Sequence, residues 1–145
     1  MTSHGFTDDM GTTKQYVGLL EADAENTSTT NKFLPFVAPV AGKLLKVFLR
    51  ANKNISGHTL TWRLETQATG VSFGTGPTIV GTQSGAGCTN LNMATYDFTS
   101  SLDSGTNAIA TDAMVYLSIQ SDTDLGQACI HYITCLWEWD YSSVG

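Results

Sequence analysis

The sequence has few charged residues and very few basic ones. Charged side chains make up 14% of the 145 residues, against about 25% in an ordinary soluble protein. Only seven are Lys or Arg, and the formal net charge is −6. Nucleic acids and anionic membranes are bound by clustered basic side chains, and the one cluster here, Lys43, Lys46, Arg50 and Lys53, falls in an apolar, strand-like run. Direct binding to a nucleic acid or a membrane is therefore not expected.

Cysteine is also scarce. The three cysteines are an odd number, which argues against a framework of disulfide bonds. Cys129 and Cys135 would lie about 20 Å apart on one extended strand, far beyond the roughly 7 Å that a disulfide can bridge. We expect three buried thiols in a protein made in a reducing cytoplasm.

Two kinds of hydrophobic segment are missing. No apolar run reaches the roughly 20 residues that a membrane-spanning helix needs. The opening MTSHGFTDDMGTTKQY has no basic patch followed by an apolar core, so no secretion signal is expected.

In place of charge, the sequence has Thr, Ser, Asn and 14 Gly, a composition that favours strands and turns over helices. Short strand-like runs recur between turn clusters, as in a sandwich or barrel. We predict an all-β fold: an eight-stranded antiparallel, jelly-roll-like β-sandwich over 14–145, preceded by a short extended N-terminal arm over 1–13. The predicted strands are 14–22, 32–38, 42–52, 58–67, 77–82, 93–99, 113–121 and 128–141.

Alternation of apolar and polar residues along these runs predicts the core. It is clearest in HTLTWRLETQ, where one side is apolar and the other is polar. Extending the same reading to the other runs predicts these core residues: Leu45, Val47, Leu49, Leu60, Trp62, Leu64, Val115, Leu117, Ile119, Ile133, Cys135 and Trp137.

The last strand, ACIHYITCLWEWDY, is apolar on both faces over its first half. Its odd positions can fill a sandwich core, while its even positions are apolar up to Leu136 and acidic at Glu138 and Asp140. Such a strand lies either between two layers or against another subunit. In a domain of two sheets the second arrangement is favoured. We therefore predict a subunit interface that includes Leu44, Phe48, Ile130, Tyr132 and Leu136.

No set of residues makes a positive case for an enzyme, a metal site or a cofactor site. GTGPTIVG has glycines but lacks the Lys and the following helix of a phosphate-binding loop. Cys129, His131 and Cys135 share a strand face, and buried structural side chains are the simpler interpretation of this grouping than a metal site. SDTDLG begins like a calcium loop but lacks the terminal glutamate, which favours a plain turn. A catalytic pair of carboxylates stays open as an alternative, because such pairs are defined in space. Glu138 and Asp140 share a strand face about 7 Å apart, but such pairs are common on solvated strands.

Three segments resemble a β-rich module of tailed-bacteriophage virion proteins of the marine and cyanobacterial type. They are FLPFVAPVAGKLLKVFLRAN, TYDFTSS and YITCLWEWDY, which match the module's opening, middle and closing strands. The likeness runs from about Lys32 to Tyr141, and it is weakest in the Gly-rich 74–88 region and in ATDAMVYLSI. It implies a jelly-roll-like sandwich that is usually trimeric, with no catalytic residues to transfer. The matching residues are Pro39, Gly42, Lys43, Leu44, Leu45, Lys46, Val47, Arg50, Tyr96, Phe98, Thr99, Thr134, Cys135, Leu136, Trp137, Glu138, Trp139 and Asp140.

The resemblance leaves three classes of function to compare. The first is a capsid decoration, or cement, protein: a homotrimer made in the host cytoplasm that binds the major capsid protein on the virion surface. The second is a head- or tail-fibre module that binds a host-surface glycan, and the third is a carbohydrate-active enzyme. The chain has no coiled coil or repeated shaft, and its polar start suits a short docking arm. These features favour the decoration protein.

Overall fold

The computed structural model of this chain describes residues 1–8, 10–19, 35–71, 76–99 and 102–142. Every regular element in these ranges is a β-strand, which confirms the predicted all-β class. The strands are β1 (Thr2–Asp8), β2 (Gln15–Val17), β3 (Phe36–Val37), β4 (Gly42–Ala51), β5 (Thr59–Gln67), β6 (Thr78–Ala86), β7 (Met93–Asp97), β8 (Ser104–Gly105), β9 (Ala108–Ile109), β10 (Met114–Ser121) and β11 (Cys129–Trp139).

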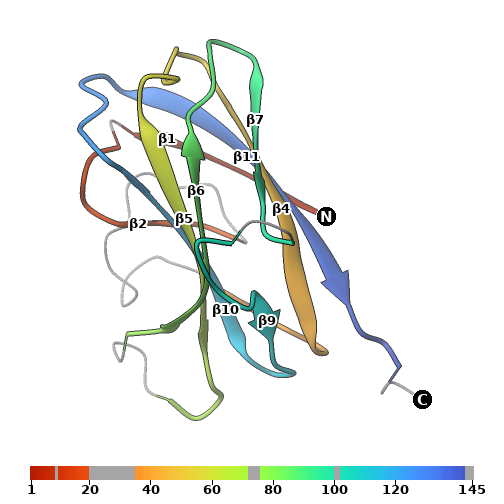
Figure 1. Cartoon of the computed structure of the whole chain (residues 1–145). Coiled ribbons are helices and arrows are strands. Elements are labelled where there is room, and N and C mark those ends of the chain that lie inside the picture. Colours follow the sequence, from red (N-terminus) through yellow and green to blue (C-terminus); the bar gives the residue numbers. More distant parts are fainter. Residues whose placement is uncertain (9, 20–34, 72–75, 100–101, 143–145) are drawn as a thin grey trace.

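The strands form two antiparallel sheets that pack face to face (Figure 1). Sheet A has the order β1-β11-β4-β7, with β9 beside β4, and sheet B has the order β2-β10-β5-β6-β8, with β3 beside β10. Without the two-residue strands β3, β8 and β9, eight strands remain. They pair first with last, second with seventh, third with sixth and fourth with fifth. This is the pairing of a long hairpin rolled over itself, so the predicted jelly-roll sandwich is confirmed.

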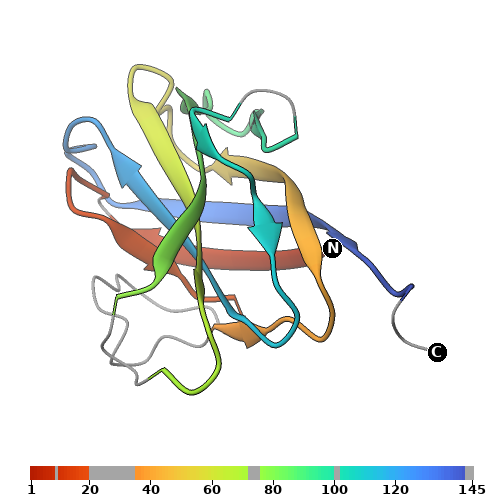
Figure 2. The same cartoon turned by 60° about the horizontal axis from the view of Figure 1, so that its bottom comes forward.

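The start of the chain differs from the prediction. Residues 2–8 are extended, but they are not a free arm, because β1 pairs with β11 from Thr2 opposite Cys135 to Asp8 opposite Cys129. Figure 2 shows β1 lying alongside β11 at the edge of sheet A. TSHGFTD lacks an alternating apolar pattern, so no strand is predicted there. The strand forms because the edge of β11 offers it backbone hydrogen bonds, and strand formation depends strongly on such context.

The segment predicted as a strand over 32–38 differs in the opposite sense. Residues 32–34 lie outside the described residues, and the rest contributes only β3, two residues long. Pro35 and Pro39 flank β3, and proline has no N–H for a strand ladder, so pairing here is short. The predicted count of eight strands thus holds only after β1 replaces this segment among the main strands.

A β-bulge in β4 decides which residues of that strand face the core. In the ladder with β11, Leu136 lies opposite Lys46 and Trp137 lies opposite Leu44, so Leu45 is the extra residue. An extra residue reverses the alternation of side chains beyond it. Leu44 therefore shares the core side with Val47 and is fully buried, whereas Leu45 is only half-buried. The predictions for both leucines were wrong: Leu44 belongs to the core, and Leu45 does not.

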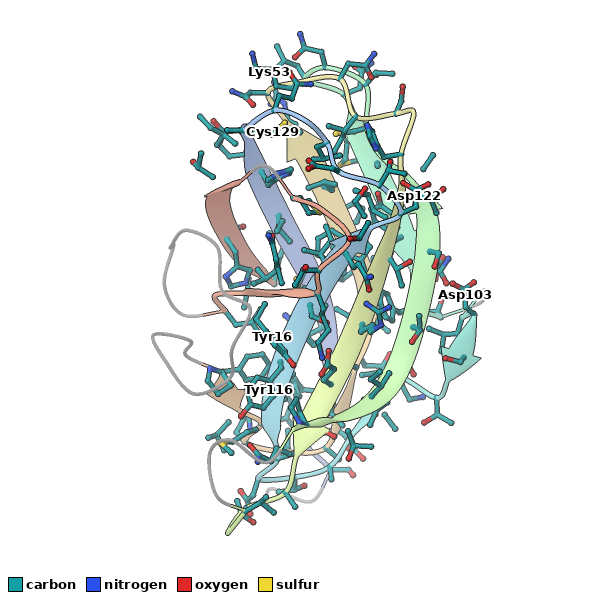
Figure 3. All side chains as sticks on the ribbon, turned by 90° about the vertical axis from the view of Figure 1, so that its left-hand side faces the viewer. Tyr16, Lys53, Asp103, Tyr116, Asp122 and Cys129 are labelled. Atoms are coloured by element: carbon teal, nitrogen blue, oxygen red, sulfur yellow. The ribbon has the colours of Figure 1, made fainter. Side chains whose placement is uncertain are left out.

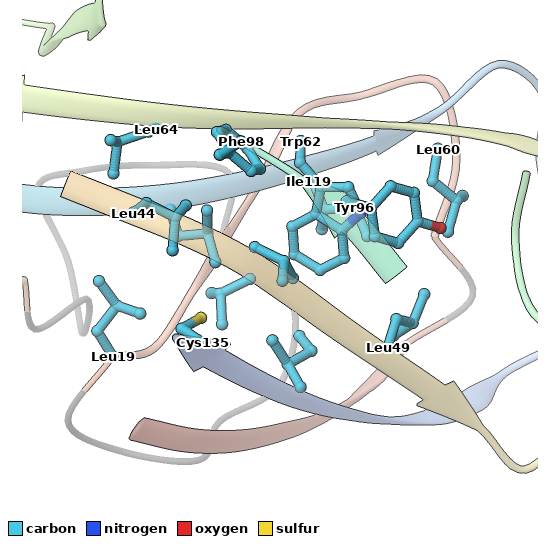
Figure 4. Packing of buried hydrophobic residues seen from close by; sticks show 14 of the residues in the cluster. Leu19, Leu44, Leu49, Leu60, Trp62, Leu64, Tyr96, Phe98, Ile119 and Cys135 are labelled. Atoms are coloured by element: carbon cyan, nitrogen blue, oxygen red, sulfur yellow. The ribbon is translucent and has the colours of Figure 1, made fainter. Parts of the chain in front are cut away.

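The core lies between the two sheets and contains every predicted core residue except Leu45 (Figure 4). Near one end of it, the rings of Trp62 and Tyr96 pack with their centroids 5.5 Å apart. The Tyr96 hydroxyl donates to the carbonyl oxygen of Ala86 at 3.0 Å, which satisfies its buried polar group. Each sheet therefore supplies a large aromatic side chain to one continuous core.

The bulge yields a prediction about stability. Leu44→Ala should lower the free energy of unfolding by about 2–5 kcal/mol, because it leaves a cavity among fully buried side chains. Leu45→Ala removes the same atoms one residue along the chain and should cost much less, since Leu45 is half-buried. Urea unfolding of both variants followed by circular dichroism measures the difference. Equal losses, or a larger loss for Leu45→Ala, would contradict the bulge.

Candidate functional site

The outward side of sheet A carries a concentration of exposed apolar side chains. We call it the β11 face and define it by Phe48, Leu91, Met93, Ile130, Tyr132 and Leu136. Met93, Leu91, Tyr132 and Ile130 are 63%, 52%, 51% and 38% exposed, and Phe48 and Leu136 are half-buried. Apolar area gathered in this way on one face is typical of an interaction surface.

The strand register explains how the β11 face is built. Tyr132 lies between Gly5 of β1 and Arg50 of β4, and Met93 of β7 lies on the other side of Arg50. Because Gly5 has no side chain, the residue directly opposite Tyr132 on β1 does not cover the Tyr132 ring. A shallow groove of about 340 Å³ runs beside this row and is lined by Phe48, Leu49, Arg50, Leu91, Met93, Tyr132 and Thr134.

The backbone of Leu91 is unusual. Its φ is 60°, in the left-handed region that non-glycine residues rarely adopt. The backbone N–H of Leu91 donates to the carbonyl oxygen of Ala51 at 3.1 Å, which ties this turn to the end of β4. A strained backbone that holds a large apolar side chain 52% exposed next to a groove is consistent with a contact role.

The apolar side chains of the β11 face lie among charged residues of both signs, and Glu138 is on the same outward side of β11. The outward side of β4 carries Lys46 and Arg50, and Lys53 follows in the next turn. Lys46 Nζ lies 3.7 Å from the carboxylate of Asp97 on β7, and both side chains are partly exposed. Such an exposed pair adds little stability, so the charge of this face bears on its choice of partner more than on folding.

Of the predicted interface residues, Phe48, Ile130, Tyr132 and Leu136 lie together on the β11 face, and Leu44 does not. Leu91 and Met93 complete the face and were missed. Met93 is the first residue of the short strand β7. It was missed because no pattern in the sequence shows that β7 pairs with β4. That this face is a subunit interface stays a prediction.

Sheet B carries a second notable group, the Glu65 cluster, made of Lys14, Tyr16, Glu65 and Ser118. The carboxylate of Glu65 is fully buried and accepts hydrogen bonds from Lys14 Nζ at 3.0 and 3.1 Å, from the Tyr16 hydroxyl at 3.2 Å and from the Ser118 hydroxyl at 2.5 Å. These bonds join β2, β5 and β10. The arrangement compensates a buried charge that would otherwise be costly.

A second tyrosine, Tyr116, extends this cluster. The rings of Tyr16 and Tyr116 meet edge to face with centroids 6.1 Å apart (Figure 3). The Tyr116 hydroxyl donates to Gln67 Oε1 at 2.8 Å. Burial raises the pKa of both tyrosines. Glu65, Ser118 and Tyr116 have no exposed surface, so the cluster as it stands fastens β2 to the sheet and offers no site to a substrate.

The other residues considered from the sequence lie in ordinary structural settings. Cys129, His131 and Cys135 are all buried, and burial raises the pKa of the Cys135 thiol to about 12. Asp124 accepts the N–H of Gly126 at 2.8 Å, which fits the expected turn. The described residues contain no group of three or more His, Cys, Asp or Glu side chains arranged to hold a metal ion. They also contain no helix long and apolar enough to cross a membrane.

Comparisons with known proteins add little to this picture. Neither a family model nor a curated protein matches the chain. A solved structure of Eiger TNF from S. frugiperda is similar at 6% sequence identity over 92% of this chain and 93% of its own, with a TM-score of 0.34. A likeness this weak carries no argument, so the jelly-roll assignment rests on the strand pairing described above.

The Glu65 cluster predicts how stability depends on pH. Burial alone lowers the pKa of Lys14, but its hydrogen bonds to Tyr16 and Glu65 outweigh this and raise that pKa. A pKa that is higher in the folded state gives stability that is complete below the unfolded value and is lost as the pH rises through the folded one. Lys14→Gln should therefore cost about 1–2 kcal/mol at pH 8, and this difference from wild type should shrink above about pH 10.5.

Urea unfolding of both proteins between pH 7 and pH 11.5 measures this dependence. Lys53→Gln is the matched control, because it removes an exposed cation in the turn after β4 of sheet A, whereas Glu65 lies on β5 of sheet B. A Lys14→Gln penalty that stays constant across this range would show that the ammonium group does not hold the cluster.

Proposed function

We propose that this chain is a bacteriophage capsid decoration protein that forms a homotrimer and binds the outer surface of the capsid through the major capsid protein. The observation that carries the proposal is the β11 face. The strand that contains the closing motif YITCLWEWDY presents an exposed apolar surface in the middle of sheet A. The resemblance to virion proteins supports the virion setting, with synthesis in the host cytoplasm.

The proposed occupant of the β11 face is a neighbouring copy of the same chain. Burying three or four of its side chains would contribute roughly 1.5–3 kcal/mol each before the cost of association. Tyr132 and Leu136 lie near the middle of the face, and Glu138 follows on the same side of β11. A central apolar patch beside a charged rim is the usual anatomy of a protein interface.

The distribution of charge supports contact between unlike surfaces of neighbouring copies, as in a three-fold ring. Arg50 and Lys53 lie beside the β11 face, and several exposed acidic residues, among them Asp103, Asp112, Asp122 and Asp124, lie on other parts of the surface. Figure 3 shows Asp103 and Asp122 away from β11, on the side of the molecule that carries β6. A ring in which Arg50 and Lys53 meet acidic residues of the next copy would pair these cations, whereas a two-fold dimer through the β11 face would bring like charges together.

A trimer also gives a physical mechanism for decoration. Three copies that contact several capsid subunits at once combine weak individual contacts into a long-lived attachment, because the second and third contacts form at a high effective concentration. The negative net charge of −6 per chain keeps the free protein soluble until it docks.

The trimer is tested by light scattering coupled to size exclusion at micromolar concentration. Wild type should be trimeric, whereas Tyr132→Asp and Leu136→Asp should be monomeric and folded, because each places a charge in the apolar contact. Ile79→Asp is the matched control, since Ile79 is 48% exposed on β6 of sheet B and should leave the trimer intact. A monomeric wild type would refute the trimer, and trimeric Tyr132→Asp and Leu136→Asp proteins would refute this interface.

Decoration is tested by co-sedimentation of the purified protein with expanded capsids of its own phage. We expect saturable binding at a fixed number of copies per capsid, with much weaker binding by the monomeric variants. No binding to expanded capsids would contradict decoration even if the trimer were correct.

The second candidate is a head- or tail-fibre module that binds a host-surface glycan. The observation that favours it is a polar pocket of about 450 Å³ at the end of β11, which is bordered by Lys43, Glu138 and Asp140. A fibre module would bind host cells and leave expanded capsids unbound, so the co-sedimentation experiment also separates the two candidates.

A further inference from the structure

An apolar pocket, which we call the edge pocket, lies between the start of β1 in sheet A and the segments around β3. Thr2 pairs with Cys135, so the first residues of the chain lie beside the last part of β11 (Figure 2). The pocket is about 330 Å³ in volume, within the range of roughly 300–1,000 Å³ that is usual for small-ligand sites. No residue of the β11 face lines it. Its lining residues are Met1, Thr2, Leu19, Phe36, Pro39, Trp137 and Trp139.

The aromatic wall of the edge pocket is held in place by its own packing. The rings of Trp137 and Trp139 stack with centroids 5.9 Å apart, and the Phe36 ring meets them edge to face at 5.2 and 5.8 Å. Gly42 lies opposite Trp139 in the ladder, and a Cβ atom at Gly42 would overlap the Trp139 ring. That ring therefore lies against the bare backbone of β4. The three rings form a surface on the core side of β11 that exists before a ligand arrives.

The chain between Phe36 and Pro39 is fixed as well. The backbone N–H of Ala38 donates to the carbonyl oxygen of Ala113 at 2.9 Å, and the N–H of Asp112 donates to the carbonyl oxygen of Ala38 at 2.8 Å. The ring of Pro39 restricts the backbone further. A pocket whose walls are already in position binds a ligand at a lower entropic cost than one that must first be ordered.

The lining of the edge pocket has little polar chemistry to offer. None of the described side chains that line it is charged, and Thr2 supplies the one hydroxyl group among them. Thr2 Oγ1 already accepts a hydrogen bond from Trp137 Nε1 at 2.9 Å. A charged ligand would lose its hydration here without gaining an ionic partner from these side chains. The lining therefore selects an uncharged ligand with a mostly apolar surface.

The size and shape of the edge pocket narrow the choice further. An apolar cavity of about 150 Å³ is large enough to hold benzene, so the edge pocket has room for a molecule of about two rings. Aromatic rings attract one another in edge-to-face and offset-stacked arrangements beyond the effect of burial alone. With Trp137, Trp139 and Phe36 in its wall, the pocket favours an aromatic ligand over an alkyl chain of similar size.

We propose that the edge pocket is a binding site for a small neutral aromatic molecule of about two rings, which packs against Trp137, Trp139 and Phe36. Such a ligand contacts the start of β1, the end of β11 and the segments around β3 at the same time. Because it binds only the folded arrangement of these segments, it raises the stability of the folded protein. The site rests on neither capsid binding nor trimer formation, so its failure leaves those proposals standing.

The experiment titrates the wild-type protein with 2-naphthol, a neutral molecule with two fused aromatic rings. Isothermal titration calorimetry should give saturable binding at one site per chain. The largest changes in amide chemical shift should fall at residues 2, 19, 36 and 137–139. Saturating 2-naphthol should also raise the midpoint of thermal unfolding. Two other ligands test the chemical class: 2-naphthoate adds a carboxylate to the same rings and should bind at least about tenfold more weakly, and 1-hexanol should bind more weakly because it has no ring.

A matched pair of variants locates the site. Phe36→Leu removes a ring from the edge pocket but keeps a half-buried apolar side chain, and it should weaken 2-naphthol binding about fivefold. Phe48→Leu makes the same change at a half-buried phenylalanine of the β11 face and should bind 2-naphthol like wild type. Trp139→Leu is a second variant of the aromatic wall and should also weaken binding.

Four results would overturn the proposal. One is the absence of saturable 2-naphthol binding by wild type, and another is tighter binding of 2-naphthoate or 1-hexanol than of 2-naphthol. The third is binding that Phe48→Leu weakens while Phe36→Leu and Trp139→Leu leave it unchanged, which would place the ligand on the β11 face. The fourth is a set of amide shifts in wild type that lies away from the edge pocket. This last measurement decides the question even if the variants of the aromatic wall do not fold.

Discussion

The ladder between β4 and β11, with its bulge at Leu45, is the constraint on which the rest of this structure depends. These two strands form the centre of sheet A: β1 pairs with the free side of β11, and β7 and β9 pair with β4. The bulge sets which side chains of β4 enter the core, so it places Leu44 inside and leaves Lys46 and Phe48 outside. A ladder without it would put Leu44 at the surface, and the set of side chains on the outward side of β4 would change with it.

The sequence predicts the parts of the fold in which apolar and polar residues alternate clearly, because there each residue type indicates which side of the strand faces the core. Leu60 and Trp62 on β5 alternate with polar neighbours, and their burial follows from that pattern. The bulge could not be predicted, because Leu44 and Leu45 are equally apolar and either can face the core. Strand β1 could not be predicted either, since its pairing depends on an edge of β11 that lies more than a hundred residues away. Alternation of apolar and polar residues therefore predicts which side of a strand is buried. It does not predict which strands pair.

The candidate site also contains residues that the sequence could predict and residues that it could not. Tyr132 and Leu136 could be identified because they are apolar residues on the face of β11 that points away from the core. Leu91 could not, since its exposure depends on a left-handed turn that the sequence does not specify. The Glu65 cluster was also beyond prediction: in HTLTWRLETQ, Glu65 occupies a position expected on the wet face. It is buried because Lys14 and Tyr16, some fifty residues earlier, supply its hydrogen bonds.

The two sides of β11 have different roles because the strand keeps a regular alternation along its whole length. The even positions up to Leu136 face outward in the middle of sheet A, where a neighbouring copy would cover them. Trp137 and Trp139 have odd positions, so their rings lie on the core side, where they stack on each other and meet Phe36. The aromatic end of the strand is therefore covered largely within the chain itself. The apolar area that is left for another copy to bury lies on the outward side, in the first half of β11.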